Sequence, residues 1–103
     1  MNPYMDCMEP NYWLSCILID EGCEVTSEKI RLELEKYNAE GRPIWKPMHL
    51  QPVFKGCDFV TEEEGKCVGT DIFNRGFCLP SDIKMTPEQQ DIVIEIVRSC
   101  FDA

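Results

Sequence analysis

The chain has 103 residues, of which 44% are hydrophobic, so it has the length of one domain and enough apolar surface for one modest core. Its formal net charge of −9 argues against binding to nucleic acid or to an anionic membrane surface, because both select basic faces. We therefore expect residues 1–103 to form a single small domain.

The first predicted elements are a strand and a helix. Residues 12–19 form a β-rich run bounded by turn-forming residues, which predicts a mostly buried strand. Thr26 is a typical N-cap, and a helix after it would end near Asn38 and Gly41. The apolar residues on one face of that helix are Ile30, Leu34 and Tyr37.

The middle of the chain is predicted to be less regular. Residues 42–45 indicate a second short strand that leads into a segment with prolines at 43, 47 and 52. Each proline fixes its own φ and pushes its predecessor toward extended geometry, so we expect a stiff, non-helical loop. Residues 53–67 contain Gly56, Gly65 and three consecutive glutamates, which predicts a solvated excursion.

The last third contains two helices and a strand. Residues 70–75 indicate a short helix closed by Gly76, and residues 77–79 a third strand. Thr86, Pro87 and Gln89 form a capping box with proline at the first helical position. The apolar stripe of that last helix is Ile92, Val93, Ile96, Val97 and Cys100. Together the elements predict an α+β fold: a small three-stranded, mainly antiparallel sheet with helices on one face.

The chain also lacks the patterns of a membrane or secreted protein. Its longest apolar run, residues 12–19, is far shorter than the roughly 20 residues that span a bilayer. At its start no basic residue is followed by an apolar stretch, as in a secretory signal. The sequence thus predicts a cytoplasmic protein that contacts no membrane.

Seven cysteines are spread along the chain without a C-x-x-C pair. They are Cys7, Cys16, Cys23, Cys57, Cys67, Cys78 and Cys100. The missing pair argues against a zinc ribbon or a thioredoxin-like motif, and the odd count argues against a disulfide scaffold. We expect reduced, structural cysteines, with metal or disulfide as the alternatives. A Cys/His nucleophile pair using His49 has little support, because nothing in the sequence selects its cysteine.

The proline-rich segment is the strongest candidate for a binding site. Residues 42–52 present Trp45, Lys46, Met48 and His49, whereas an ordinary connector would be polar and glycine-rich. The alternative is structural: Trp45 and Met48 pack on the core while Lys46 and His49 are solvated.

Several ordered blocks resemble the C-terminal small domain of the DegT/DnrJ/StrS-type sugar aminotransferases. They are residues 9–16 (EPNYWLSC), 26–31 (TSEKIR), 41–54 (GRPIWKPMHLQPVF), 71–81 (DIFNRGFCLPS) and the helical pattern from residue 86 onward. The resemblance therefore covers about residues 9–100, nearly the whole chain.

The resemblance implies a fold-type I enzyme that uses pyridoxal phosphate and aminates a nucleotide-linked keto sugar for cell-surface polysaccharide or glycan biosynthesis. It suggests a UDP-linked 4-keto-6-deoxy sugar as acceptor and glutamate as donor. Substrate-binding residues would be Trp45, Lys46, Met48 and His49, with Lys46 facing a diphosphate and His49 bonding a substrate oxygen. Partners would be the large domain and a second subunit of a homodimer. Arg42 and Arg75 have simpler structural explanations: Arg42 pairs with a glutamate of the acidic helix, and Arg75 lies at a helix end.

The chain lacks what such an enzyme needs for its cofactor. None of its six lysines has the context of the Schiff-base lysine, and no glycine- or serine-rich phosphate cradle precedes a helix. We therefore expect the large cofactor-binding domain to be absent from this chain, no pyridoxal phosphate to bind it, and no activity in isolation. The alternative function is a free-standing, non-catalytic protein-interaction module.

Overall fold

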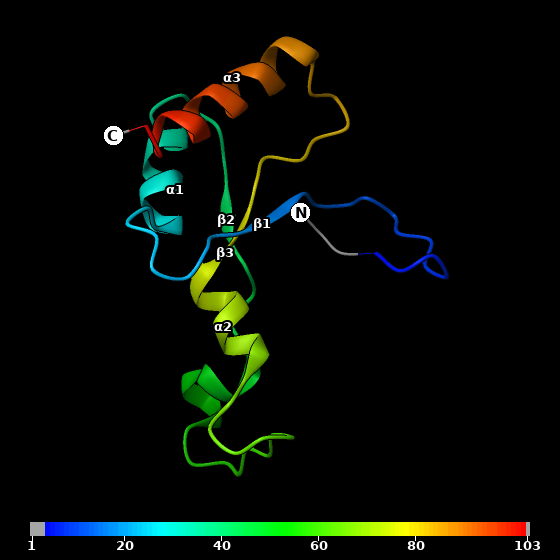
Figure 1. Ribbon diagram of the computed structural model, residues 1–103, viewed down its shortest axis with the longest axis vertical. Helices are drawn as coiled ribbons and strands as arrows, with labels where there is room; N and C mark the ends of the chain where they lie inside the picture. The colour runs from blue at the N-terminus through cyan, green and yellow to red at the C-terminus, as the bar shows by residue number, and fades with distance from the viewer. Residues whose placement is uncertain (1–3, 103) are drawn as a thin grey trace.

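Three short strands pair into an antiparallel sheet with β3 at its centre (Figure 1). The strands are β1 (Cys16–Leu18), β2 (Arg42–Pro43) and β3 (Gly76–Cys78). Cys16 and Arg42 both lie opposite Cys78, from the two sides of β3. The computed structural model describes residues 4–102. All three strands are shorter than predicted from the sequence or shifted by one residue, and β1 covers only three residues of the expected run.

The first helix, α1 (Ser27–Glu35), begins where the sequence predicts, because the Thr26 hydroxyl accepts the Lys29 amide at 3.1 Å. Ile30 and Leu34 are fully buried. Tyr37 is 63% exposed, which corrects its assignment to the same face. The helix ends at Glu35, so the position two residues later is no longer on the helical stripe.

The last helix, α3 (Pro87–Ser99), confirms the predicted capping box: Thr86 and Gln89 each bond the other's backbone amide. It packs on α1, and the Lys29 ammonium donates to the Cys100 carbonyl at 2.8 Å. Ile96 and Cys100 are buried, but Ile92 is 49% exposed and departs from the predicted stripe. The first turns of α3 extend past α1, which leaves that part of the stripe uncovered by α1 (Figure 1).

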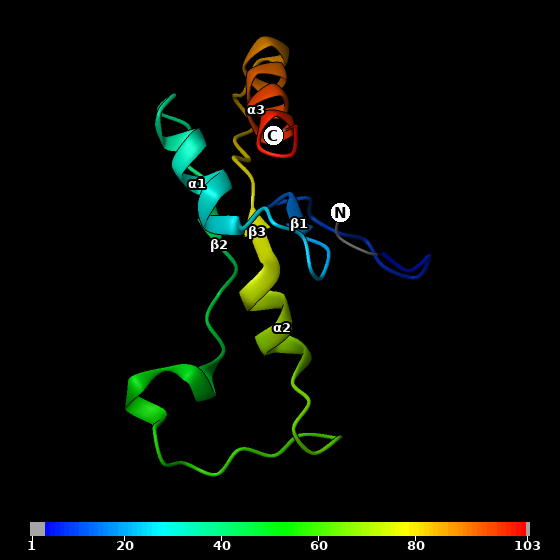
Figure 2. The ribbon, with the colours of Figure 1, turned by 60° about the vertical axis from the view of Figure 1, so that its left-hand side comes forward.

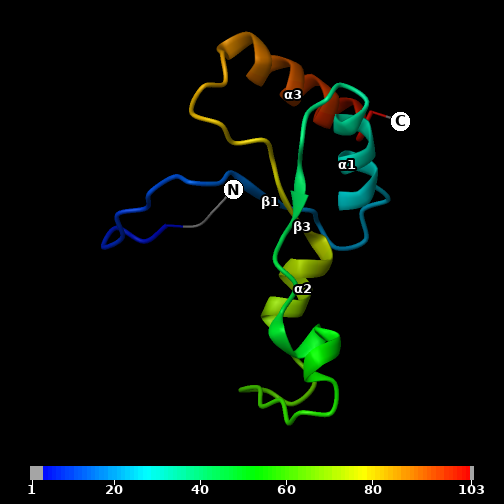
Figure 3. The same cartoon turned by 180° about the vertical axis from the view of Figure 1, so that it is seen from behind.

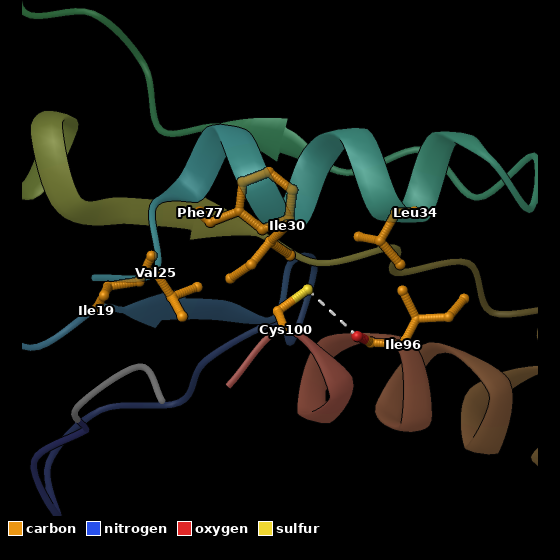
Figure 4. Packing of buried hydrophobic residues seen from close by; sticks show 7 residues of the cluster. All are labelled: Ile19, Val25, Ile30, Leu34, Phe77, Ile96 and Cys100. Atoms are coloured by element: carbon orange, nitrogen blue, oxygen red, sulfur yellow. Dashed lines mark hydrogen bonds between the residues drawn. The ribbon is translucent and has the colours of Figure 1, made fainter. Parts of the chain in front are cut away.

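The core lies between α1, α3 and one face of the sheet (Figure 4). Phe77 of β3 points into it and is 1% exposed. The other members are Ile19, Val25, Ile30, Leu34, Ile96 and Cys100. The expected small α+β domain is thereby confirmed. We call residues 16–43 and 76–100 the packed half.

Residues 44–75, which we call the arm, extend away from the packed half (Figures 1 and 2). They contain two 3-10 turns, η1 (Met48–Leu50) and η2 (Pro52–Phe54), and the helix α2 (Val68–Arg75). The turns correct the expectation of a wholly non-helical loop: Pro52 occupies the first position of η2, where no amide donor is needed. The arm explains a radius of gyration of 16.0 Å, against about 13 Å for a compact chain of this length.

Arg75 ties the arm to the packed half through its side chain and its backbone, since its carbonyl also accepts the Ile19 amide at 3.1 Å. The Arg75 guanidinium holds the Asp71 carboxylate through two nitrogens, at 2.7 and 2.6 Å, and its third nitrogen donates to the Ile19 carbonyl at 2.6 Å. This exceeds the helix-end role expected for Arg75.

No helix within residues 4–102 is both long and apolar enough to cross a membrane.

Candidate functional site

A pocket of about 500 Å³ lies where the packed half meets the arm. Side chains of successive strand residues point to opposite faces of a sheet, so Cys78 points away from the core that Phe77 enters. Cys78 forms the floor of this pocket, on the second face of the sheet. The other lining residues used below are Trp13, Trp45, Lys46, Phe73 and Ser81. These five residues come from four separate segments of the chain, so the pocket exists only in the folded state.

Two indoles form one wall of the pocket. The ring centroids of Trp13 and Trp45 lie 6.0 Å apart with their planes tilted by 48°. Both side chains remain mostly exposed, at 67% and 62%. The prediction that Trp45 is presented rather than buried therefore agrees with its position, and the alternative in which it packs into the core is wrong. The exposed ring faces are available to a ligand.

Lys46 supplies a cation at the same pocket. Within residues 4–102 no carboxylate lies in ion-pair distance of its ammonium group, whereas the neighbouring Arg42 is paired with Glu40 at 2.8 Å. Arg42 was expected to pair with a glutamate of the acidic helix, but Glu40 lies after that helix. Lys46 is thus the pocket's unpaired positive charge.

Met48 and His49 lie on η1, on the arm, and do not line this pocket. The His49 ring stacks on Phe59 at 3.7 Å between centroids, with 15° between the planes, and its Nε2 is 3.1 Å from the Thr70 hydroxyl. Met48 is 60% exposed, and its sulfur accepts from the Gln51 side chain at 3.5 Å. The four predicted residues therefore separate into two pairs, Trp45 and Lys46 at the pocket and Met48 and His49 on η1.

A cysteine lies close to the His49 cluster. The Thr70 hydroxyl and amide, together with the Gly69 amide at the start of α2, lower the pKa of the Cys67 thiol below its usual value. Thr70 therefore lies between Cys67 and His49. The sequence offered no reason to select this cysteine, because the two residues are 18 positions apart and meet only through the fold of the arm.

Pyridoxal phosphate would need a phosphate cradle beside a lysine. Helix N-termini commonly bind phosphate, and Thr26 and Thr86 each bond one amide of the first turn, in α1 and α3 respectively. Among the described lysines, Lys29 donates to a backbone carbonyl. Lys36 and Lys66 pair with glutamates of their own segments. Within residues 4–102 no group of three or more His, Cys, Asp or Glu side chains is placed to hold a metal ion.

The fold and pocket define a small α+β domain with an aromatic, cation-bearing cavity beside its sheet. The chain belongs to the DegT/DnrJ/EryC1/StrS aminotransferase family, whose profile matches residues 2–98. The family resemblance drawn from the ordered blocks is confirmed.

Two curated relatives show the extent of the similarity. The chain is 40% identical over 91 residues, 88% of its length, to EpsN of Bacillus subtilis (strain 168), whose name describes it as a pyridoxal phosphate-dependent aminotransferase. It is 25% identical over 92 residues, 89% of its length, to the GDP-perosamine synthase of Vibrio cholerae. These matches cover 23% and 24% of the relatives, so the chain spans about a quarter of their length.

The sequence did not indicate three of the pocket's residues. Trp13, Phe73 and Ser81 lie in the blocks that carry the family resemblance, but nothing in their local pattern distinguishes a pocket wall from a core contact. Trp13 reaches Trp45 only because β1 and β2 flank the same central strand. Local sequence spacing does not encode which distant strands pair, so the sequence could not place these three residues at the pocket.

Proposed function

We propose that this chain is the small domain of a pyridoxal phosphate-dependent aminotransferase that aminates a nucleotide-linked keto sugar, with glutamate as the amino donor. Family membership and the name of EpsN support the aminotransferase chemistry. The name of the Vibrio cholerae relative supports a nucleotide-linked sugar as the acceptor. In this proposal the large domain of the parent enzyme supplies the cofactor site, and a second subunit completes a homodimer.

The pocket carries the proposal for this chain's own residues. A sugar ring presents C–H groups, which carry partial positive charge and pack favourably on the negative face of an indole such as Trp45. A diphosphate needs a cation without a competing carboxylate, and Lys46 meets that condition. A wall of paired indoles beside one unpaired ammonium therefore suits a sugar nucleotide, and we favour a UDP-linked 4-keto-6-deoxy sugar.

His49 and Met48 have a separate place in the proposal. The Thr70 contact occupies one ring nitrogen of His49, and its Nδ1 has no partner within residues 4–102. That nitrogen is the one we assign to a substrate oxygen, with Met48 as part of an apolar wall. Because neither residue lines the 500 Å³ pocket, this assignment requires the large domain or second subunit to place the substrate near η1.

A ligand titration tests the pocket. Indole fluorescence of the chain is followed while UDP-N-acetylglucosamine is added, with UDP and N-acetylglucosamine as separate arms. We expect Lys46→Gln to weaken the nucleotide sugar about tenfold, since losing one charged contact to phosphate costs about 1.4 kcal/mol or more. Lys55→Gln is the matched control, because Lys55 is an exposed lysine of the arm outside the pocket. Equal affinity in both variants would contradict the assignment of Lys46.

A protein-interaction module remains the second candidate, and exposed apolar side chains favour it. Tyr12, Val53 and Val60 are 74%, 77% and 89% exposed. Sedimentation of the chain and inspection of the coding region for a large domain with a Schiff-base lysine separate the two candidates. A free-standing reading frame with no sugar-nucleotide binding would favour the module.

A further inference from the structure

Two cysteines lie opposite each other in the sheet, 62 residues apart in the sequence. Cys16 of β1 is the register partner of Cys78 of β3, and their sulfur atoms are 3.6 Å apart. Both side chains line pockets on the sheet face opposite the core between α1 and α3. Figure 3 shows the backbone of the strands β1 and β3 from behind. The fold therefore brings two thiols into contact under the Trp13–Trp45 wall.

The hydrogen-bond pattern of the strands favours a bond between these sulfurs. The Leu79 amide donates to Ser15 at 2.9 Å and the Ile19 amide donates to Arg75 at 3.1 Å. Hydrogen-bonded pairs alternate along an antiparallel ladder, so the pair of Cys16 and Cys78 falls at a non-hydrogen-bonded position. At such positions the Cα atoms are about 4.5 Å apart and the side chains are closest, which lies within the range that a disulfide spans.

The surrounding strands need no shift for the bond to form. The Ser15 amide donates to the Ser81 hydroxyl at 3.0 Å, and that hydroxyl donates to the Leu79 carbonyl at 2.9 Å, so both ends of the pair are held in register. Closing the gap from 3.6 Å to a disulfide of about 2.05 Å requires rotation of the two side chains alone. None of these contacts depends on the arm.

We propose that Cys16 and Cys78 are a redox pair that a low-molecular-weight disulfide converts into a cross-strand disulfide. Cys16 is half-buried and Cys78 is 4% exposed, so Cys16 is the thiol that meets the oxidant. The Cys16 thiolate attacks one sulfur of the oxidant, RSSR, and expels one thiolate, RS⁻. Cys78 then attacks the Cys16 sulfur and expels the second. Two protein thiols lose two electrons and two protons, and RSSR becomes two RSH.

The remaining cysteines show why this pair is selected. Cys7, Cys23 and Cys57 are exposed, and Cys67 is half-buried at the start of α2, outside the sheet. Cys100 lies in the core, where its thiol donates to the Ile96 carbonyl at 3.4 Å. The exposed thiols can form mixed disulfides with the oxidant, but none of them has an aligned partner across a strand pair. An internal disulfide should therefore accumulate at Cys16 and Cys78 while the exposed cysteines carry, at most, the oxidant's thiol.

The test uses the whole chain, purified under reductant and then equilibrated with oxidised glutathione. After acid quenching and alkylation, the chain is cleaved after glutamate, after aromatic residues, and after Lys and Arg. This places Cys16 alone in residues 14–21 and Cys78 alone in residues 78–84. We expect these two segments to be joined in the dominant disulfide-linked product. The linked chain should melt at least about 5 °C higher, reversibly with reductant, because the bond constrains the unfolded chain.

Cys23→Ser provides the matched control, because Cys23 is exposed and lies near Cys16 in sequence. It should leave both the linked product and the rise in melting temperature unchanged, whereas Cys16→Ser should abolish both. Glutathione attached to the exposed cysteines without a 16–78 link would overturn the proposal. So would a linked product with other pairings in equal amount, or one whose melting temperature does not rise.

Discussion

The packed half and the arm are stabilised by different kinds of contact. Every buried hydrophobic side chain of residues 4–102 belongs to the packed half, whereas residues 44–75 contain no buried residue. The arm is held instead by local polar contacts, the His49–Phe59 stack and the Arg75 bridge. Segments with few buried contacts open at low free energy, and binding loops are commonly drawn from them. The candidate site therefore combines Cys78, on the packed half, with Trp45 and Lys46, on the arm, where local opening should cost less free energy.

Truncating Phe77 should cause the largest loss of stability. A small loss would contradict the contrast between the packed half and the arm. Phe77 is 1% exposed in the core, so Phe77→Ala should lower the free energy of unfolding by about 3–5 kcal/mol. Phe59→Ala is the matched change in the arm, where the ring is 50% exposed, and should cost about 1 kcal/mol. Urea denaturation measures both. If Phe77→Ala does not fold, Phe77→Leu, expected to cost about 1.5 kcal/mol or less, keeps the comparison measurable.

Removing Arg75 should loosen the arm without unfolding the packed half. Arg75→Ala deletes the Asp71 pair and the bond to Ile19, so amide exchange in α2 should become several-fold faster while α1 is unchanged. Arg31→Ala is the control, because Arg31 pairs with Glu28 and Glu35 within one helix. It should leave α2 exchange as it was. Equal acceleration in α1 and α2 by Arg75→Ala would show that the arm is no separate unit.

The free energy of unfolding at alkaline pH should depend on the buried Cys78 thiol of the sheet and not on the exposed Cys57 thiol of the arm. Burial, followed by the hydrogen bond with Cys16, raises the pKa of the Cys78 thiol from the usual 9.0 to about 11. Between these values the unfolded chain has lost a proton that the folded chain keeps. The free energy of unfolding therefore falls as pH rises through this window, and the contribution is complete below it.

The measurement is urea denaturation under reductant at a series of pH values across that window. Cys78→Ala should flatten the part of the slope that belongs to this thiol, relative to the native chain. Cys57→Ala removes an exposed thiol of the arm and should leave the slope unchanged. A slope that survives in Cys78→Ala would assign the alkaline loss to other groups.

The packed half was predictable from the sequence because its signals are local. The hydroxyls of Thr26 and Thr86 cap amides three residues away, so each helix start can be identified within a short window. The same holds for Ile30 and Leu34, which are one helical turn apart. Gly41 was expected only to end a helix. In the structure, any side chain at this position would also collide with the Phe77 ring, a constraint set by residues 36 positions apart.

The arm and the pocket were less predictable because their contacts are not periodic. Proline patterns indicated an extended loop, yet Pro47 and Pro52 precede or begin 3-10 turns that place His49 against Phe59. Selecting Trp45 and Lys46 from their composition found part of the pocket. The sequence could not show that Met48 and His49 lie outside the pocket. The position of η1 depends on the contact between His49 and Thr70 of α2.

The smallest expected effects concern two of the arm's candidate substrate residues, Lys46 and His49. Lys46→Ala should change the free energy of unfolding by no more than about 0.5 kcal/mol, because its ammonium group has no ion-pair partner within residues 4–102. His49→Ala should cost about 1 kcal/mol, since it loses the stack on Phe59.

In the full-length enzyme of our proposal, both changes should lower turnover with the sugar nucleotide while leaving the absorbance of the bound cofactor intact. Lys46→Ala should act chiefly through KM, because a point charge on a diphosphate binds ground and transition states alike. His49→Ala should act more on kcat, since the stack and the Thr70 contact hold its ring in a fixed position. A loss of about 2 kcal/mol or more in the isolated chain would make either residue structural. Unchanged turnover would remove it from the substrate site even though the arm is exposed.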